Sequence, residues 1–466
     1  MIFRRLYHDG LAQASYLIAC ERTRAALVVD PLRDPTPYLE AAAFEDVRLA
    51  FVAETHIHAD FLSGAEVLAQ TAGAELLLSA ERADAQATAR IRRTAATELY
   101  DGTSITMGDV RLDVRHTPGH TPEHVSILVS DLANGGIPVG LLTGDFLFVG
   151  DVGRPDLLER AVGVPDSMRD AARDLYRSLQ AIRSLPEFLQ LWPGHGAGSA
   201  CGRSLGAVPQ STLGYELRTN WAFQIHDDAA FVDEVLRDQP DPPAYFARMK
   251  AANAGAVALI PQRKRMGDDE LREAVRAGAL LVDTRPATEY MSAHAASSLS
   301  IPRGRSFLHW AGAILDPTRD VVLLTEQAQR AAANSAIHDL ALIGFDRVLG
   351  AISTTDLASL ATDGEESVAR VAASEVPLRG GGTIVDVRTE REWRDGHIPG
   401  ALHVPLTQLP ARLDELRGVG KILVHCQGGA RSTIAASVLR AAGITDVANV
   451  DGGYPAWLRE HAESPV

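Results

Sequence analysis

The chain has 466 residues, of which 46% are hydrophobic and 23% are charged, and its formal net charge is -15 at pH 7. This length suits about three domains of roughly 150 residues each. The negative charge argues against binding to nucleic acids or to anionic membranes. No apolar run approaches the roughly 20 residues of a membrane-spanning helix, and the first residues lack the apolar core of a signal peptide.

The chain contains only three cysteines, Cys20, Cys201 and Cys426, and they are far apart in the sequence. An odd and sparse set argues against a disulfide framework and favours a reducing compartment. We therefore expect a cytoplasmic protein. The sequence does not fix the oligomeric state, so a homo-oligomer stays open.

The first half of the chain alternates short β-type runs with turns and helices. Six apolar runs end in or just before a polar residue or a histidine; they are residues 16–19, 25–30, 48–56, 111–117, 139–145 and 189–195. Strands that carry His or Asp at their carboxyl ends are typical of a scaffold for a site. Residues 211–248 read as helical and charged, and the segments 240–245 and 261–270 bracket a domain boundary.

The strand ends carry five candidate metal ligands: His56, His58, His120, Asp145 and His195. His56 and His58 are two residues apart, so both point to one side of an extended backbone. Imidazole nitrogens with a carboxylate suit a first-row divalent metal. Five such residues, each at a strand end, predict a metal site.

The segment from Thr55 to Phe61 reads T-H-I-H-A-D-F. It resembles the T-H-x-H-x-D-H motif of the metallo-β-lactamase superfamily, and the resemblance extends over about residues 1–245. In the dinuclear hydrolases of that superfamily, the Asp and His of D-H build the second metal position. Phe61 cannot coordinate a metal, so the resemblance disfavours a stable two-zinc site and leaves the other position intact.

Four longer segments are similar to the persulfide dioxygenase branch: ETHIHADFLSG, HTPGHTPEHVS, TGDFLFVGDVGRPDL and PGHGAGSACG. The resemblance implies one mononuclear Fe(II) per chain, held by His56, His120 and Asp145. Two imidazoles and one carboxylate form a facial arrangement that leaves about three coordination positions for substrate and O2.

His58, Asp60 and His195 then lie beside the metal or face the substrate. Asp60 either orients a ligating histidine or makes a purely structural hydrogen bond. Arg154 either binds an anionic substrate or pairs with the carboxylate two residues later, and the ion pair is slightly favoured.

Two further residues near these motifs have open roles. Thr121 and Pro122 predict the start of a helix, which makes His124 a packing residue. Cys201 follows His195 in a glycine-rich segment. It is expected either to accept or relay a sulfane sulfur at the rim of the metal pocket or to be an ordinary buried cysteine.

The second half contains an internal repeat, because residues 281–302 align without a gap on residues 384–405. Both copies read V-D-x-R, followed by Glu, His and Pro at equal spacings, and both continue into an apolar run and a helix. The repeat predicts two copies of one α/β domain, at 263–362 and 370–466, with the junction at 361–370.

The second copy carries a cysteine loop between a strand and a helix. Its residues are Cys426, Gln427, Gly428, Gly429, Ala430 and Arg431. Loop N–H groups, the helix N-terminus and Arg431 should stabilise a thiolate, which makes Cys426 a candidate nucleophile. The loop resembles the C-x-x-G-x-R loop of rhodanese sulfurtransferases, and its six-residue length implies a cradle sized for sulfur. Asp386, Arg388, Glu392 and His397 resemble scaffold residues.

The first copy departs from this pattern, because Glu326 or Gln327 is expected where the cysteine should be and no glycines follow. A domain without this thiolate cannot form a persulfide. Residues 263–362 are therefore expected to be a pseudo-rhodanese domain.

We expect an α/β protein with an N-terminal αβ/βα sandwich followed by two rhodanese-like domains. The resemblances imply oxidation of a low-molecular-weight thiol persulfide by O2 to sulfite. Transfer of sulfur by Cys426 to sulfite would then give thiosulfate, in sulfide detoxification. One alternative is a zinc thioester hydrolase of the glyoxalase II type. Another is a sulfur-carrier or redox-sensing binding protein that has lost catalysis.

Overall fold

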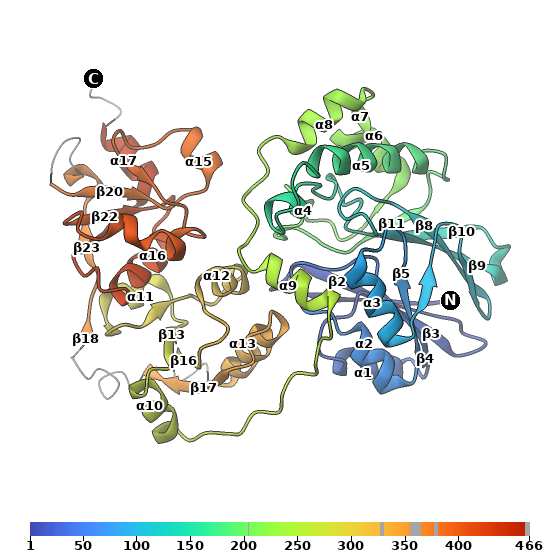
Figure 1. Cartoon of the computed structure of the whole chain (residues 1–466), viewed down its shortest axis with the longest axis horizontal. Helices are drawn as coiled ribbons and strands as arrows, with labels where there is room; N and C mark the ends of the chain where they lie inside the picture. The colour runs from blue at the N-terminus through green and yellow to red at the C-terminus, as the bar shows by residue number, and fades with distance from the viewer. Residues whose placement is uncertain (204, 327–329, 355–364, 377–380, 462–466) are drawn as a thin grey trace. The chain divides into compact units, whose positions relative to one another are not determined.

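The computed structural model describes residues 1–203, 205–326, 330–354, 365–376 and 381–461. It divides into two compact units (Figure 1), Met1–Pro261 with Leu342–Gly344, and Gln262–Ala341 with Phe345–Val466. Gln327 and residues 361–364 of the expected junction lie outside the described residues. In the part of the chain that the structure describes, no helix is long and apolar enough to cross a membrane.

Two six-stranded sheets form the frame of the first unit. One sheet runs in the order β1 (Ile2–His8), β2 (Gln13–Ala19), β3 (Ala25–Val29), β4 (Arg48–Ala53), β5 (Glu75–Ser79) and β6 (Thr97–Leu99). The other runs β12 (Ser211–Thr212), β11 (Gln190–Pro193), β10 (Pro138–Gly144), β9 (Val125–Asp131), β8 (Val110–His116) and β7 (Ser104–Met107). All six apolar runs noted in the sequence are strands, because alternate residues of each can be buried between the two sheets.

Apolar side chains from both sheets form a core between them, with Leu27 and Val29 from one sheet and Leu112 and Val114 from the other. Helices cover the outer faces. They are α1 (Thr36–Phe44), α2 (Ala65–Ala72), α3 (Ala85–Thr94), α4 (Leu157–Arg160), α5 (Met168–Ile182), α6 (Leu213–Thr219), α7 (Trp221–Gln224), α8 (Asp228–Leu236) and the 3-10 helix η1 (Leu132–Asn134). The expected αβ/βα sandwich is confirmed.

The first unit continues beyond residue 245, where the sequence suggested an end. Helix α9 (Phe246–Ala254) belongs to this unit. The side-chain amide of Asn253 donates to the carbonyls of His58 and Phe61, at 2.8 and 2.7 Å, and its oxygen accepts from the N–H of Ser63. These three hydrogen bonds fasten α9 to the loop that follows β4. The proline-rich segment before α9 is thus a connection within the unit.

The second unit contains two parallel sheets, as the repeat predicts. One runs β15 (Leu299–Ser300), β13 (Leu280–Asp283), β16 (Val321–Thr325) and β17 (Val348–Ser353); the other runs β19 (Ala369–Val371), β23 (Val447–Val450), β22 (Ile422–His425), β20 (Thr383–Asp386) and β21 (Leu402–His403). β14 (His294–Ala295) pairs with β18 (Glu365–Glu366). The helices are α10 (Asp268–Arg276), α11 (Ala287–Ser292), α12 (Phe307–Ile314), α13 (Arg330–Leu342), α15 (Glu390–Arg394), α16 (Ala430–Ala441) and α17 (Gly453–His461), with 3-10 helices η4 (Ala373–Glu375), η5 (Leu409–Ala411) and η6 (Leu413–Leu416).

The two copies share one ion pair with the same partners. Arg388 donates to both carboxylate oxygens of Asp386 and to the carbonyl of Gly396. Arg285 donates in the same way to Asp283 and to the carbonyl of residue 293. Both carboxylates are fully buried, so each needs its guanidinium to offset the cost of burying a charge.

Strand pairing identifies the residue of the first copy that stands in place of the cysteine. Asp386 pairs with His425, and Cys426 follows; Asp283 pairs with Leu324, and Thr325 follows. The counterpart of Cys426 is therefore Thr325, one residue before the expected Glu326. A buried threonine hydroxyl is not a nucleophile at neutral pH, so the correction leaves the interpretation of this copy unchanged.

Gly153 allows a close approach between two loops of the first unit. A Cβ atom at this position would collide with the carbonyl oxygen of Asp145 and lie 3.0 Å from the Cβ of His120. We predict that Gly153→Ala lowers the free energy of unfolding by about 1–3 kcal/mol, because backbone must move to admit the methyl group. Chemical denaturation of the full chain measures this. The exposed Gly255, whose added Cβ meets nothing closer than 3.4 Å, is the control, and equal losses for the two variants would contradict the prediction.

Candidate metal centre and cysteine loop

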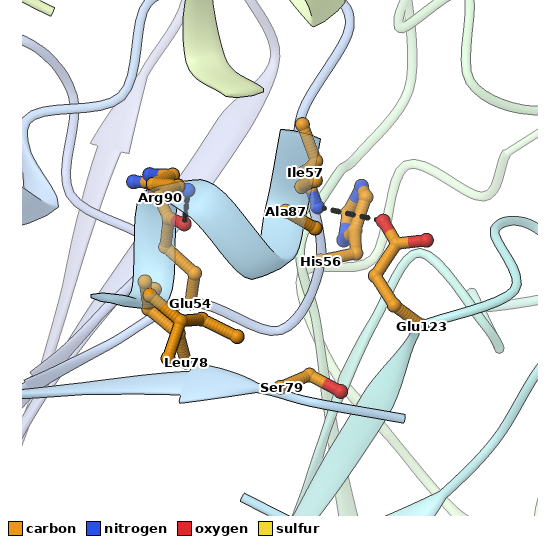
Figure 2. Close-up of a pocket in the computed structure, with 9 residues that line it drawn as sticks. Glu54, His56, Ile57, Leu78, Ser79, Ala87, Arg90 and Glu123 are labelled. Carbon is orange, nitrogen blue, oxygen red and sulfur yellow. Dashed lines mark hydrogen bonds and ion pairs between the residues drawn. The ribbon is translucent and has the colours of Figure 1, made fainter. Parts of the chain in front are cut away.

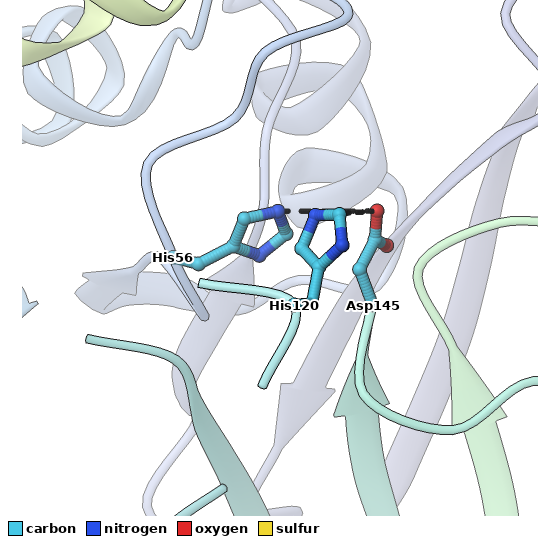
Figure 3. Close-up of side chains that lie close together, drawn as sticks. All are labelled: His56, His120 and Asp145. Carbon is cyan, nitrogen blue, oxygen red and sulfur yellow. Dashed lines mark ion pairs between the residues drawn. The ribbon is translucent and has the colours of Figure 1, made fainter. Parts of the chain in front are cut away.

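Three buried side chains from separate loops meet at one edge of the sandwich (Figure 3). His56 follows β4, His120 lies between β8 and β9, and Asp145 follows β10. One potential ligand atom of each lies within 4.8 Å of the others. The Nε2 atoms of His56 and His120 are 3.9 and 3.7 Å from Oδ2 of Asp145. The structure thus brings together the three residues that the sequence suggested as ligands.

The other ring nitrogen of each histidine has a hydrogen-bond partner. Thr55 donates its hydroxyl to Asp30, so its oxygen can accept from Nδ1–H of His56 at 2.9 Å. The Nδ1–H of His120 donates to the carbonyl of Arg154 at 3.2 Å. These partners place the proton on Nδ1 and leave both Nε2 lone pairs facing Asp145, which is how metal-binding histidines are oriented.

The protonation states of the two histidines and of Asp145 favour binding of a cation. Burial lowers the pKa of His56 and of His120, so both rings are neutral at neutral pH and can bind metal. Burial alone would raise the pKa of Asp145, but the neighbouring His195 holds it below its usual value. Oδ2 of Asp145 is buried and has no hydrogen-bond partner among the described residues. An unpaired carboxylate oxygen opposite two imidazole lone pairs fits a divalent first-row metal.

His124 positions Asp145 and was missed as a functional residue. The backbone N–H of Asp145 donates to Nε2 of His124 at 3.1 Å, and Nδ1 of His124 is 2.9 Å from the hydroxyl of Thr117. Burial lowers the pKa of His124 to about 3, so the ring stays a neutral acceptor. The helix predicted to begin at Thr121 is wrong, because the chain makes a turn there and β9 starts at Val125.

His195 joins the candidate centre to Asp60. Its Nδ1 is 2.7 Å from Oδ1 of Asp145, and its Nε2 is 2.8 Å from Oδ2 of Asp60. Burial would lower the pKa of His195, but the two carboxylates raise it well above its usual value. Asp60 therefore holds His195, and the sequence had left open which histidine it might orient.

His58 points to a different partner. Its Nε2 is 3.1 Å from Oδ1 of Asp30, a residue that the sequence did not single out. Burial would lower the pKa of His58, and the Asp30 carboxylate raises it. Phe61 is fully buried, and its ring lies against the ring of His58 with 4.4 Å between centroids. His58 is thus held by Asp30 and Phe61 outside the group of three.

Arg154 forms the ion pair that the sequence slightly favoured. Its fully buried guanidinium donates to both oxygens of Asp156 at 2.9 and 2.7 Å, and to the carbonyl of Ala200 at 3.2 Å. These buried contacts support the ion-pair role, one of the two roles that the sequence left open. The Arg154 N–H also donates to the carbonyl of Cys201, so Arg154 fastens the segment that carries this cysteine.

Cys201 is buried beside Asp60 and His195, where one ligand atom of each lies within 4.8 Å of the others. Burial and the nearby carboxylates raise the pKa of its thiol well above the usual value. Cys201 is thus a neighbour of the centre and is not part of the group of His56, His120 and Asp145.

A small pocket reaches His56 from the side of α3 and β5 (Figure 2). Glu54 and Arg90 form a buried ion pair in its wall at 2.5 Å, and Glu123 accepts from the N–H of Ile57. Apolar side chains of β5 and α3 complete the lining. The polar groups in this wall are mostly paired with one another.

The cysteine loop of the second unit lies between β22 and α16. The N–H of Gly429 donates to Sγ of Cys426 at 3.0 Å, and the hydroxyl of Ser432 donates at 3.4 Å. Gly429 has a φ of 99°, a conformation that favours glycine. Cys426 is 1% exposed, whereas Gln427 and Gly428 are exposed. The sulfur lies at the N-terminus of a helix, where a thiolate is stabilised.

Arg431 is fixed by a residue expected to be scaffold. Its guanidinium donates to both carboxylate oxygens of Glu392, at 2.6 Å each. Burial would raise the pKa of Glu392, but Arg431 lowers it to about 2. Glu392 therefore orients the loop arginine. His397 stacks on Trp393, in keeping with a scaffold role.

Comparison with protein families gives two matches. The model described as the metallo-beta-lactamase superfamily matches residues 8–195, and the model described as the rhodanese-like domain matches residues 372–460. These regions contain the candidate metal centre and the cysteine loop, respectively.

Individual proteins agree with both matches. The crystal structure of a metallo-beta-lactamase from Staphylococcus aureus is 38% identical, with a TM-score of 0.69, over 76% of this chain and 99% of that one. The mitochondrial persulfide dioxygenase of Homo sapiens is 26% identical over 42% of this chain and 68% of that protein. A sulfurtransferase of Allochromatium vinosum is 36% identical over 21% of this chain and 86% of that protein.

Three further curated relatives are covered over only 40% to 60% of their own length. The similarity of each half of the chain is nevertheless to a different class of protein, and each half contains the side chains described above. The chain therefore belongs to the metallo-β-lactamase superfamily, and its residues 372–460 form a rhodanese-like domain.

Proposed function

We propose that the first unit is a non-haem Fe(II) dioxygenase that oxidises a low-molecular-weight thiol persulfide to sulfite. The observation that carries the proposal is the buried, unpaired Oδ2 of Asp145 opposite the Nε2 atoms of His56 and His120. These three would hold one iron per chain. Bound there, iron supplies open positions at which a persulfide sulfur and O2 can meet.

The chain's own residues orient the ligands and exclude water. Thr55 and the carbonyl of Arg154 keep the ring protons of His56 and His120 on Nδ1. His195 and His124 hold the Asp145 carboxylate and its backbone in place. All these groups are buried, so the charge of the carboxylate acts at low dielectric. We assign Asp60, His195 and Cys201 to the surroundings of the substrate.

For the second unit we propose sulfur transfer by Cys426. Its thiolate would attack the outer sulfur of a persulfide, R-S-S-H, which forms Cys-S-S⁻ and releases R-S-H. Sulfite would then attack that outer sulfur, which gives thiosulfate and restores the thiolate. Hydrogen bonds from Gly429 and Ser432 to Sγ support an anionic sulfur. We propose that both reactions occur in the cytoplasm and remove sulfide-derived sulfur.

The metal assignment is tested on protein purified without air. We expect about one iron per chain and O2 uptake on addition of glutathione persulfide. His56→Ala, His120→Ala and Asp145→Ala should each lose the iron and the uptake, because each removes one of three ligands. His58→Ala is the control and should retain most of its iron, since His58 is bound to Asp30. Bound zinc with thioester cleavage, or complete iron loss in His58→Ala, would refute the assignment.

Sulfur transfer is tested with Cys426→Ser. A serine hydroxyl is not ionised at neutral pH and cannot hold a persulfide, so we expect unchanged O2 uptake, accumulation of sulfite and loss of enzymatic thiosulfate. Cys20→Ser, which alters a buried cysteine of the first unit, should behave like the intact chain. Mass spectrometry should find one added sulfur atom on Cys426 in the intact protein. Equal thiosulfate yields from both variants, after correction for the uncatalysed reaction, would exclude Cys426 as the nucleophile.

A further inference from the structure

Helix α9 carries a lysine, Lys250, that has no counter-ion among the described residues. Lys250 is half-buried, and it makes no hydrogen bond or ion pair with any residue that the structure describes. The chain has 60 acidic and 45 basic residues, so carboxylates that could pair with a lysine are abundant. A partly buried ammonium without a partner loses hydration and gains nothing in return. Lys250 is therefore available to an anionic ligand.

Hydrogen bonds from Asn253 fix the face of α9 that carries Lys250. The two residues are three positions apart, so they lie on one face of the helix. Asn253 donates to two backbone carbonyls of the loop that follows β4 and carries His56. Burial lowers the pKa of His56 and of His120, and the positive charge of Lys250 contributes to both shifts. The Lys250 ammonium therefore lies close enough to act on the candidate metal centre.

The residue before α9 adds a buried hydroxyl on the side of the centre that we assign to the substrate. Tyr245 is 7% exposed, and its hydroxyl makes no hydrogen bond with any described residue. Burial raises the pKa of this hydroxyl, and Asp60 and Cys201 raise it further, so Tyr245 lies near these two residues. A buried tyrosine hydroxyl usually has a hydrogen-bond partner. This part of the chain thus offers both a hydroxyl and an ammonium to a polar ligand.

We propose that Lys250 binds an anionic group, a carboxylate or a phosphate, of the thiol that carries the persulfide, and so selects anionic carriers. The inference rests on the proposed function, because it names the class of its substrate. An ammonium pairs with either anion as a point charge. The sulfur end of the substrate then lies at the metal centre, and Tyr245 donates its hydroxyl to a polar group of the carrier. Glutathione offers carboxylates, and coenzyme A offers phosphates.

Equilibrium binding of the thiols tests the inference without turnover. Calorimetry on the full-length protein, purified without air, measures binding of glutathione, of coenzyme A and of 2-mercaptoethanol, whose carrier end is uncharged. Lys250→Met keeps an unbranched side chain and removes its charge, so it should weaken binding of the first two thiols at least about tenfold. Lys250→Arg restores the charge and should retain most of the binding. Lys264→Met is the control, because Lys264 is 81% exposed and pairs with Glu270.

Kinetics with the corresponding persulfides separates recognition of the carrier from recognition of the sulfur. With glutathione persulfide and coenzyme A persulfide, Lys250→Met should raise KM about tenfold and change kcat by less than about twofold, because the carrier is bound equally in the ground and transition states. The persulfide of 2-mercaptoethanol should keep its KM. Added salt should raise the KM of the intact protein for the anionic carriers, since it screens the ion pair, and should have little effect on the variant.

The outcomes distinguish this inference from the proposed function. A loss confined to coenzyme A identifies the anion as phosphate, and a loss confined to glutathione identifies it as carboxylate; either supports the inference. An equal loss with 2-mercaptoethanol would overturn it, because Lys250 would then act on the sulfur or on the fold. Unchanged binding and KM with both anionic carriers would overturn it as well. Absence of O2 uptake in the intact protein, with Lys250-dependent thiol binding retained, would count against the dioxygenase alone.

Discussion

The buried carboxylate of Asp145 is the constraint around which the first unit is arranged. A charge without solvent is costly unless surrounding groups compensate it. One oxygen accepts from His195, and the backbone N–H is held by His124, but the other oxygen has no partner among the described residues. The neutral rings of His56 and His120 offer lone pairs to the same space. A divalent cation bound between them would satisfy all three groups at once.

The sandwich brings these side chains together because loops from both sheets lie at the same edge. Loops after β4 and β10 carry His56 and Asp145, and the turn before β9 carries His120. Close approach of these loops requires Gly153, which has no room for a side chain. Asn253 fastens the loop after β4 from α9. The candidate metal site thus depends on contacts distributed over the whole unit.

The two copies in the second half share a buried ion pair but differ at the position of the cysteine. Both copies keep an Asp–Arg pair with the same hydrogen bonds, because a buried carboxylate in each requires it. The residue that follows the paired strand differs between the copies, and it is Cys426 in one and Thr325 in the other. In the copy that contains the cysteine, Glu392 also binds the loop arginine, Arg431, and so fixes its position.

Local sequence alone determined the strands, the repeat and the motif residues, because alternation, spacing and glycine loops are short-range signals. It could not rank the five candidate ligands without the family resemblance. The tertiary structure showed that His58 turns to Asp30 and that His195 bridges Asp60 and Asp145. It also showed that Thr325 stands at the cysteine position of the first copy, and that the first unit extends to Pro261. These features depend on hydrogen bonds and strand pairs between residues that are far apart in the chain, and no local sequence pattern encodes such contacts.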